Sequence, residues 1–318
     1  MIKYGLTKTG TQRWRCNFCK NTSTRKRKDV SKNNTKKLKE SWMRGFKSLS
    51  DIAKNKGVRR ETLSRKFSSL SNKTKLNKLK PLPKKLILVF DGKNISKDDV
   101  LMLSYEYLSK QPFAWMFTER EDFDSWFALM TRIKKDYEVE VVVSDGQKGL
   151  IKAVKEVFGD ISHQRCIIHV KRFCLSRLTL NPKTEAGKEL RILACKISKV
   201  KTITEVNEWK SSFLEWNKKH KEFLKEKSIN PLINKSWFTH RKLRAVRSHL
   251  NNALDSMFLY TENIKIPSTT NCVEGGINSP LTELLWRHRG ITKEQRRELV
   301  LSYLSARRKP KLPTRNVT

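Results

Sequence analysis

The spacing of apolar residues divides the chain into a basic, mostly helical beginning and a longer region in which strands and helices alternate. Continuous runs of β-branched and apolar residues at 86–90 and 139–145 predict two strands that are buried on both faces. Further apolar runs at 100–109, 112–119 and 163–170 predict three more strands. Apolar residues at helical spacing separate the later runs, so the expected order is β-β-β-α-β-α-β.

A helical pattern without strong strand signals then occupies about residues 175–264. It places Trp209, Phe213 and Trp216 on one helical face, which indicates core packing. The alternative is that one or two of these aromatic side chains stack on flipped DNA bases. A last amphipathic helix follows Glu274 and ends at Gly290.

This order of elements predicts an α/β fold in the 85–318 region, with a mixed sheet of the ribonuclease-H-like kind and an α-helical insertion. In such a sheet the first strand and the strand after the first helix lie side by side at the centre. Asp91 directly follows the first of these two strands, and Asp145 closes the second. We therefore expect the two carboxylates to be neighbours in space.

A third acid, Glu274, stands at the start of the later helix. Three converging carboxylates can hold a pair of hard cations such as Mg²⁺. Two such ions, about 3.5–4 Å apart, stabilise both the attacking and the leaving oxygen of a phosphodiester. The pattern therefore predicts a metal-dependent nuclease or a DNA strand-transfer enzyme.

Each acid also has a simpler explanation. Asp91 and Asp145 each precede glycine, and Asp-Gly is a common turn signal. Asp145 could cap the helix that follows it, and Glu274 could complete a capping box that starts at Thr270 or Asn271. None of these explanations accounts for two strand-end acids in a strongly basic chain, so together they favour a site.

Charge narrows the class of partner. The 318 residues include 69 Lys and Arg against 31 Asp and Glu, for a net charge of +38. Residues 1–80 alone carry 25 basic and 4 acidic side chains, a density that attracts polyanions, above all nucleic acid. We find no apolar stretch of 18 or more residues and no signal-peptide pattern, which predicts a soluble cytoplasmic protein that does not bind membranes.

The cysteines are scattered, as in a protein with reduced thiols. Cys16 and Cys19, in the segment 1–30, resemble the second half of a zinc ribbon. A structural zinc site needs four ligands, and no other Cys-x-x-Cys precedes this pair. We expect a metal-free remnant; a lost first knuckle or a misassigned start are the alternatives, and zinc stays an open question.

Residues 31–72 have the pattern of a helix-turn-helix: two short amphipathic helices joined at Gly57. The second helix is expected to enter the major groove of DNA. Its candidate DNA-contacting residues are Arg59, Arg60, Arg65 and Lys66. The alternative is an ordinary helical hairpin with solvated basic side chains. Residues 73–84, rich in lysine and containing two prolines, predict a basic linker.

The motifs around the three acids, together with QRCIIHVKR at 164–172, resemble a bacterial insertion-sequence transposase of the Mutator-like DDE superfamily. The basic amino-terminal region is similar to the subgroup that begins with a zinc ribbon and a helix-turn-helix. The resemblance implies Mg²⁺-dependent cleavage and joining of DNA at terminal inverted repeats, with Mn²⁺ as a substitute. It assigns catalysis and binding of two metal ions to Asp91, Asp145 and Glu274.

The resemblance also implies a bacterial, nucleoid-associated protein that binds element ends and target DNA as a homodimer or a larger assembly. The Cys166–His169 pair belongs to the shared motif. It could be half of a zinc site, could shape the cleft near Asp145, or could be a buried thiol beside a satisfied histidine. His288 and Arg289 could steady a scissile phosphate or lie at a solvated helix end.

Two other functions are compatible with these residues. One is a domesticated, catalytically silent DNA-binding regulator that keeps only sequence recognition. The other is a structure-selective nuclease that cuts DNA without strand transfer. Mg²⁺-dependent nicking distinguishes the enzymes from the regulator, and joined products distinguish the two enzymes.

Overall fold

The computed structural model describes most of the chain, and its contacts divide it into two compact units. The described residues are 1–24, 28–45, 48–70, 79–230 and 234–308. The first unit combines residues 1–76 with 282–305, and the second combines 77–281 with 306–318. The expected catalytic region, 85–318, is therefore split by contacts, because 282–305 groups with the amino-terminal residues.

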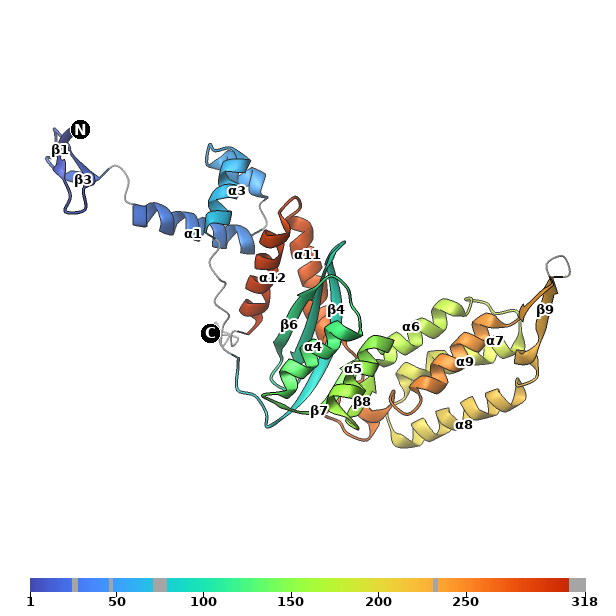
Figure 1. The fold of residues 1–318 in the computed structure, drawn as a ribbon. Helices are drawn as coiled ribbons and strands as arrows, with labels where there is room; N and C mark the ends of the chain where they lie inside the picture. The colour runs from blue at the N-terminus through green and yellow to red at the C-terminus, as the bar shows by residue number, and fades with distance from the viewer. Residues whose placement is uncertain (25–27, 46–47, 71–78, 231–233, 309–318) are drawn as a thin grey trace, which may run out of the picture. The chain divides into compact units, whose positions relative to one another are not determined.

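The second unit is built on a five-stranded mixed sheet with the order β6-β5-β4-β7-β8 (Figure 1). Its strands are β4 Lys85–Ser96, β5 Asp99–Glu106, β6 Gln111–Thr118, β7 Glu138–Ser144 and β8 Ser162–Arg165. Strands β4, β5 and β6 are antiparallel neighbours, whereas β7 is parallel to both β4 and β8. The predicted order of elements and the central pairing of β4 with β7 are both present.

Helices α4 Phe123–Lys134 and α5 Lys148–Phe158 cover one face of this sheet (Figure 1). Alternate residues of β4 point to that face, as the two-residue period of a strand requires. Leu86, Leu88 and Phe90 pack there with Trp126 of α4 and Leu150 of α5, and all are buried. The aliphatic and aromatic pattern of the strands and helices thus forms one continuous core.

Strand β4 is longer than its apolar run. The expected strand ended at residue 90, yet β4 continues to Ser96, and residues 97–98 form the turn into β5. Asp91 and Gly92 pair with Leu103 and Met102 inside the antiparallel ladder, so they do not form a turn. The parallel ladder with β7 ends at Val89, so Asp91 lies just beyond the point where β7 leaves β4.

Strand β8 is shorter than expected, because helix α6 (Ile167–Arg177) begins inside the apolar run 163–170. Ile167, Val170 and Cys174 are spaced as one helical stripe, and all three are buried in the core of the helical region. The short run alone could not distinguish a strand from a helix. The correction places Cys166 at the helix N-cap and His169 in its first turn.

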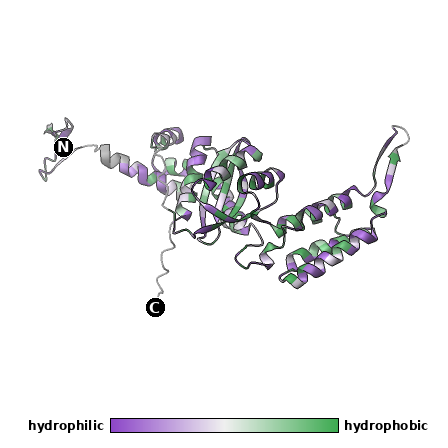
Figure 2. Ribbon diagram, turned by 60° about the horizontal axis from the view of Figure 1, so that its bottom comes forward, coloured by the Kyte–Doolittle hydropathy of each residue, from purple (hydrophilic) through white to green (hydrophobic). Residues whose placement is uncertain are grey.

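The expected insertion is largely helical. Its elements are α7 Glu185–Lys196, η1 Ile197–Lys199, α8 Ile203–Lys219, η2 Phe223–Lys225, β9 Lys227–Asn230, β10 Lys235–Phe238, α9 Arg241–Ala253 and η3 Leu259–Thr261. The antiparallel β9–β10 hairpin was not predicted from the sequence. Helices α6 to α9 carry apolar and hydrophilic residues on different faces, and the apolar faces meet in one core (Figure 2). Trp209, Phe213 and Trp216 are buried in that core.

Three consecutive helical segments follow the insertion: α10 Asn271–Val273, the π-helical turn η4 Glu274–Asn278, and α11 Ser279–Arg287. π-Helical turns are rare and often mark functional positions. Before the sheet, residues 79–84 form no helix or strand, and Leu79 and Leu82 pack against its core. Residues 73–78 of the expected linker lie outside the described residues.

The first unit begins with a three-stranded antiparallel sheet: β1 Ile2–Leu6, β2 Gln12–Arg15 and β3 Thr22–Thr24. Its helices are α1 Lys28–Arg44, α2 Leu49–Asn55, α3 Arg60–Ser69 and most of α12 Lys293–Arg307. Ser48 and Asp51 form a capping box at the start of α2, and Gly57, with a φ of +61°, turns the chain toward α3. The two helices expected in 31–72 are therefore present, with an additional helix before them.

Leu63 and Phe67 of α3 pack on Trp42 of α1, Ile52 of α2 and Leu299 of α12. This small core explains why residues 282–305 belong to the first unit by contacts. Within the described part of the chain, no helix is long and apolar enough to cross a membrane.

Candidate active site

Asp91 lies in the second unit among other acids. Its Oδ2 atom accepts a hydrogen bond from Asn278 Nδ2 at 2.6 Å. Burial, followed in decreasing order by the negative charges of Glu274, Asp145 and Glu121, raises the pKa of Asp91 to about 7. Like charges act on one another in this way only when they are close. The structure therefore places the three predicted acids, with Glu121 as a fourth, close enough for their charges to interact, although in the described part of the chain their carboxylate oxygens do not all lie within 4.8 Å of one another.

Asp145 directly follows β7, in a turn that only glycine can complete. Gly146 has a φ of +84°, and a Cβ atom at this position would lie 2.2 Å from Arg165 Nε. Asp145 Oδ1 accepts the backbone N–H of Gln147 at 2.9 Å, which fixes the carboxylate at the start of α5. The predicted turn role of Asp145 is real, and it leaves the carboxylate beside the other acids.

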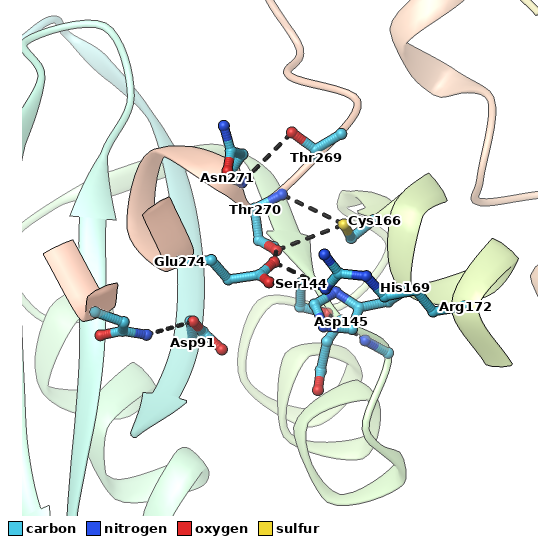
Figure 3. Close-up of polar contacts among 12 residues, drawn as sticks. Asp91, Ser144, Asp145, Cys166, His169, Arg172, Thr269, Thr270, Asn271 and Glu274 are labelled. Carbon is cyan, nitrogen blue, oxygen red and sulfur yellow. Dashed lines mark hydrogen bonds and ion pairs between the residues drawn. The ribbon is translucent and has the colours of Figure 1, made fainter. Parts of the chain in front are cut away.

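Glu274 lies at the start of the π-helical turn. Its Oε1 atom accepts a hydrogen bond from the Thr270 hydroxyl, and its Oε2 atom is 3.2 Å from Arg172 Nη1 (Figure 3). A capping box would instead join the Glu274 carboxylate to the backbone N–H of the N-cap. The Thr270 N–H donates to the Cys166 sulfur at 3.4 Å, so Glu274 does not serve as a capping residue with Thr270.

Cys166 and His169 lie next to Glu274, at the start of α6 (Figure 3). Burial raises the pKa of Cys166, but His169 and the Thr270 donors outweigh burial and leave the pKa lowered. The Cys166 side chain, with smaller effects from Glu274 and Asp145, raises the pKa of His169 to about 9 against the effect of burial. His169 Nδ1 is 3.6 Å from Glu274 Oε1. The pair therefore lies within the site.

Glu121 was not predicted, because it stands in a short connection with no motif of its own. A Cβ atom on Gly92 would lie 2.3 Å from Glu121 Oε2, so the absence of a side chain at Gly92 makes room for this carboxylate. Burial raises the pKa of Glu121, and Asp145 raises it further. Glu121 thus belongs to the same group of acids.

Three further residues of the site could have been suspected from spacing. Arg172 follows His169 by three residues and shares its helical face, and Asn278 follows Glu274 by four. Arg165, which precedes Cys166, is 4% exposed, and burial lowers its pKa while Asp145 raises it. Arg165 is therefore a buried positive charge beside Asp145.

The other predicted residues lie in the first unit. His288 is buried edge-on against Trp42, with ring centroids 4.9 Å apart, and Arg289 lies over the Trp286 ring at 4.4 Å. Both side chains therefore pack against tryptophan rings, which favours a structural role over the contact with a scissile phosphate that the sequence also suggested. In α3 and at its N-cap, the side chains expected to meet DNA are all exposed: Arg59, Arg60, Arg65 and Lys66.

Cys16 and Cys19 form a tight turn between β2 and β3, in which Lys20 N–H donates to Cys16 O at 3.1 Å. Both cysteines are free thiols. Among the residues that the structure describes, the only group of three or more potential metal ligands gathered at one point is Cys166, His169 and Glu274. The described residues therefore offer no third ligand to the Cys16–Cys19 pair.

Comparison with protein families identifies the middle of the chain. Residues 109–230 match the family described as "Transposase, Mutator family". The match covers less than half of the chain and makes this segment similar to the Mutator-family transposases. The segment contains Asp145, Cys166 and His169, and its match implies transposase function, DNA binding and a divalent metal for DDE catalysis. None of the curated proteins compared with the chain matches it.

Proposed function

We propose that the protein is a bacterial insertion-sequence transposase that binds the terminal inverted repeats of its element and catalyses DNA strand cleavage and strand transfer. In this proposal the second unit is a ribonuclease-H-like DDE domain with a helical insertion. The catalytic residues are Asp91, Asp145 and Glu274. The family match to residues 109–230 supports the class of enzyme.

One observation carries the proposal: three carboxylates lie near the buried Asp91 in a chain of net charge +38. Burial and the repulsion from these carboxylates raise the pKa of Asp91 to about 7, which lowers the stability of the fold when Asp91 is ionised. Such strongly perturbed groups cluster at functional sites. A fold gains nothing from this arrangement unless positive charge is brought to it during function.

The oxygen donors fit divalent cations such as Mg²⁺, which prefer carboxylates. Asp91, Asp145 and Glu274 would hold the ions, with Glu121 beside them. When bound, two Mg²⁺ or Mn²⁺ ions would supply Lewis-acid activation of the attacking oxygen and neutralise the leaving one. The number and identity of the ions are part of the proposal.

The protein's own groups have separate tasks in this scheme. Asn278 donates to Asp91 Oδ2 and so orients that carboxylate. Arg172, whose side chain is 65% exposed, is available to a DNA phosphate as well as to Glu274. The two ends of an element must meet for transposition, so we propose a homodimer or a larger assembly.

DNA recognition is assigned to the first unit. Helix α3 is proposed to enter the major groove, with its exposed arginines and Lys66 over bases and phosphates. This role resembles that of a helix-turn-helix, which here would act without zinc at Cys16 and Cys19. The binding should depend steeply on salt, because several phosphate contacts release counterions.

The decisive test replaces Asp91, Asp145 or Glu274 with alanine in the full chain and measures Mg²⁺-dependent nicking of a duplex that carries the element end. We expect each change to reduce nicking by at least about 10³-fold while DNA affinity stays within about twofold, since the loss falls on charge stabilisation at the reacting phosphate. Asp160→Ala, an exposed acid in the same unit, is the matched control.

Wild-type nicking in any of the three variants would exclude this catalytic assignment. Binding without nicking in the wild-type protein would instead favour the silent regulator. Nicking without joined products would favour a nuclease. Imperfect inverted repeats bounded by a short direct duplication on either side of the gene would support transposition independently of any protein assay.

A further inference from the structure

Beside the oxygen-lined group of acids lies a second cluster with different donor chemistry. It consists of Cys166, His169 and Glu274, each offering one ligand atom, and these three atoms lie within 4.8 Å of one another. Cys166 is the N-cap of α6 and His169 lies in its first turn, whereas Glu274 comes from the π-helical turn. Figure 3 shows the three side chains pointing toward one another.

The distance between two of the ligand atoms is close to that found around a metal ion. His169 Nδ1 is buried, and no described group makes a well-formed hydrogen bond to it. Its separation of 3.6 Å from Glu274 Oε1 is too long for a hydrogen bond. Nitrogen and oxygen ligands that are each about 2.0–2.1 Å from a tetrahedral zinc lie roughly 3.3–3.4 Å apart, so a small closure would complete the geometry.

The surroundings of the Cys166 sulfur also favour metal binding. The Thr270 N–H donates to Cys166 Sγ at 3.4 Å, and the Thr270 hydroxyl oxygen lies 3.5 Å from it. Donors directed at sulfur favour the thiolate, which is the form that binds metals. The same hydroxyl donates to Glu274 Oε1, so Thr270 holds two of the three ligands in register.

We propose that Cys166, His169 and Glu274 bind one thiol-preferring divalent cation of the Zn²⁺ class, with the fourth position open. Thiolate and imidazole donors select zinc-like ions over Mg²⁺, which prefers oxygen alone. Three protein ligands with an open position are typical of accessible zinc sites and not of closed structural ones.

Glu274 is common to this cluster and to the proposed Mg²⁺ ligands. A cation on the sulfur side would hold Glu274 beside His169 and compete with its use next to Asp91. The site would then switch the oxygen-lined centre off when zinc is abundant. This consequence alone rests on the proposed function; the metal site itself does not.

The test uses Co²⁺ as a spectroscopic probe of the full-length protein, without DNA. Cys16 and Cys19 are both changed to serine beforehand, so that they cannot contribute thiolates. We expect one equivalent of Co²⁺ to produce a thiolate-to-metal charge-transfer band together with the visible bands of a tetrahedral ion. Added Zn²⁺ should remove both by displacement.

Cys166→Ser should abolish the charge-transfer band, and His169→Ala and Glu274→Gln should each weaken Co²⁺ binding by more than about tenfold, since even outer-shell changes can cost that much. Cys272→Ser, a half-buried thiol on α10, is the matched control and should keep the band. Far-ultraviolet circular dichroism checks that each variant is folded, and His169→Ala tests the site with the sulfur in place. The proposal is overturned if the band is absent in the parent protein or persists in Cys166→Ser.

Discussion

The core tryptophans of the helical insertion and the acidic site belong to the same unit, but they differ in whether their buried polar atoms have hydrogen-bond partners. In the insertion, Trp209 Nε1 donates to Leu193 O at 2.9 Å and Trp216 Nε1 donates to Ala186 O at 3.0 Å. Phe213 stacks with both indole rings. Every one of these buried donors is satisfied, as stable cores require.

The acidic site instead retains groups in costly states. Asp91 is surrounded by carboxylates, and Arg165 Nε and His169 Nδ1 are buried without a hydrogen-bond partner. Unsatisfied buried groups cost free energy that the rest of the fold must supply. The comparison indicates that the insertion stabilises the unit, whereas the site is kept ready for charged ligands at the expense of stability.

The largest effect should come from the insertion. Trp216→Ala removes a buried ring and its hydrogen bond, so we expect the free energy of unfolding to fall by about 3–5 kcal/mol. Urea denaturation followed by circular dichroism measures the change. Leu214→Ala, on the same helix but 60% exposed, should shift it by no more than about 0.5 kcal/mol. Equal effects of the two changes would contradict the proposed role of the insertion core.

A substitution in the acidic site should instead raise the free energy of unfolding. Folded Asp91 keeps its proton up to a pKa of about 7, whereas the unfolded chain loses it near the ordinary value of 3.8. The cost to stability therefore develops as the pH rises from about 4 to about 7 and is fully present at pH 8. Asp91→Asn removes this charge, so in EDTA at pH 8 it should stabilise the protein by a few kcal/mol, at most about 4.

Thermal unfolding at pH 8 and at pH 4 tests this sign. The gain should fall to well under about 1 kcal/mol at the lower pH, because the folded carboxyl is protonated there and the unfolded carboxyl is close to its titration midpoint. Asp160→Asn, which changes an exposed acid, should show no such pH-dependent gain. A destabilised Asp91→Asn at pH 8 would show that the Asn278 hydrogen bond outweighs charge repulsion.

The same contrast explains what could be predicted from the sequence. The central β4–β7 pairing could be predicted, because continuous β-branched runs and the order of elements restrict which strands can be neighbours. The buried aromatic face of α8 could also be predicted, since Trp209, Phe213 and Trp216 repeat at helical spacing. Core packing leaves a periodic signal.

The details of the site leave much weaker signals. The run 163–170 contains both the end of β8 and the start of α6, and four apolar residues cannot decide between them. The hairpin formed by β9 and β10 has strands of only four residues each, which are too short to show a clear alternation of apolar and polar residues. Glu121 reaches the other acids only through the fold, and no spacing in the sequence connects it with Asp91.

Trp237 also belongs to the insertion but, unlike the core tryptophans, it is partly exposed. It lies on β10, is 37% exposed, and has Arg241 over its ring at 5.5 Å. It lines a cavity of about 670 Å³ together with basic side chains that include Arg177 and Lys183. This combination of an aromatic surface and positive charge suits an unpaired DNA base and its phosphate.

Trp237→Ala should therefore have the smallest effect on folding, within about 0.5–1 kcal/mol, because it removes only a half-exposed ring and one cation–π contact. Its effect should instead appear in DNA binding, where losing one base–aromatic stack weakens the affinity for ends with unpaired bases by at least about fivefold. Fluorescence anisotropy with paired and frayed duplex ends measures the difference. If the Trp237→Ala protein binds both kinds of end as the wild type does, the insertion has a purely structural role. The other aromatic residues considered for base stacking, Trp209, Phe213 and Trp216 of α8, are buried and expose no ring to DNA.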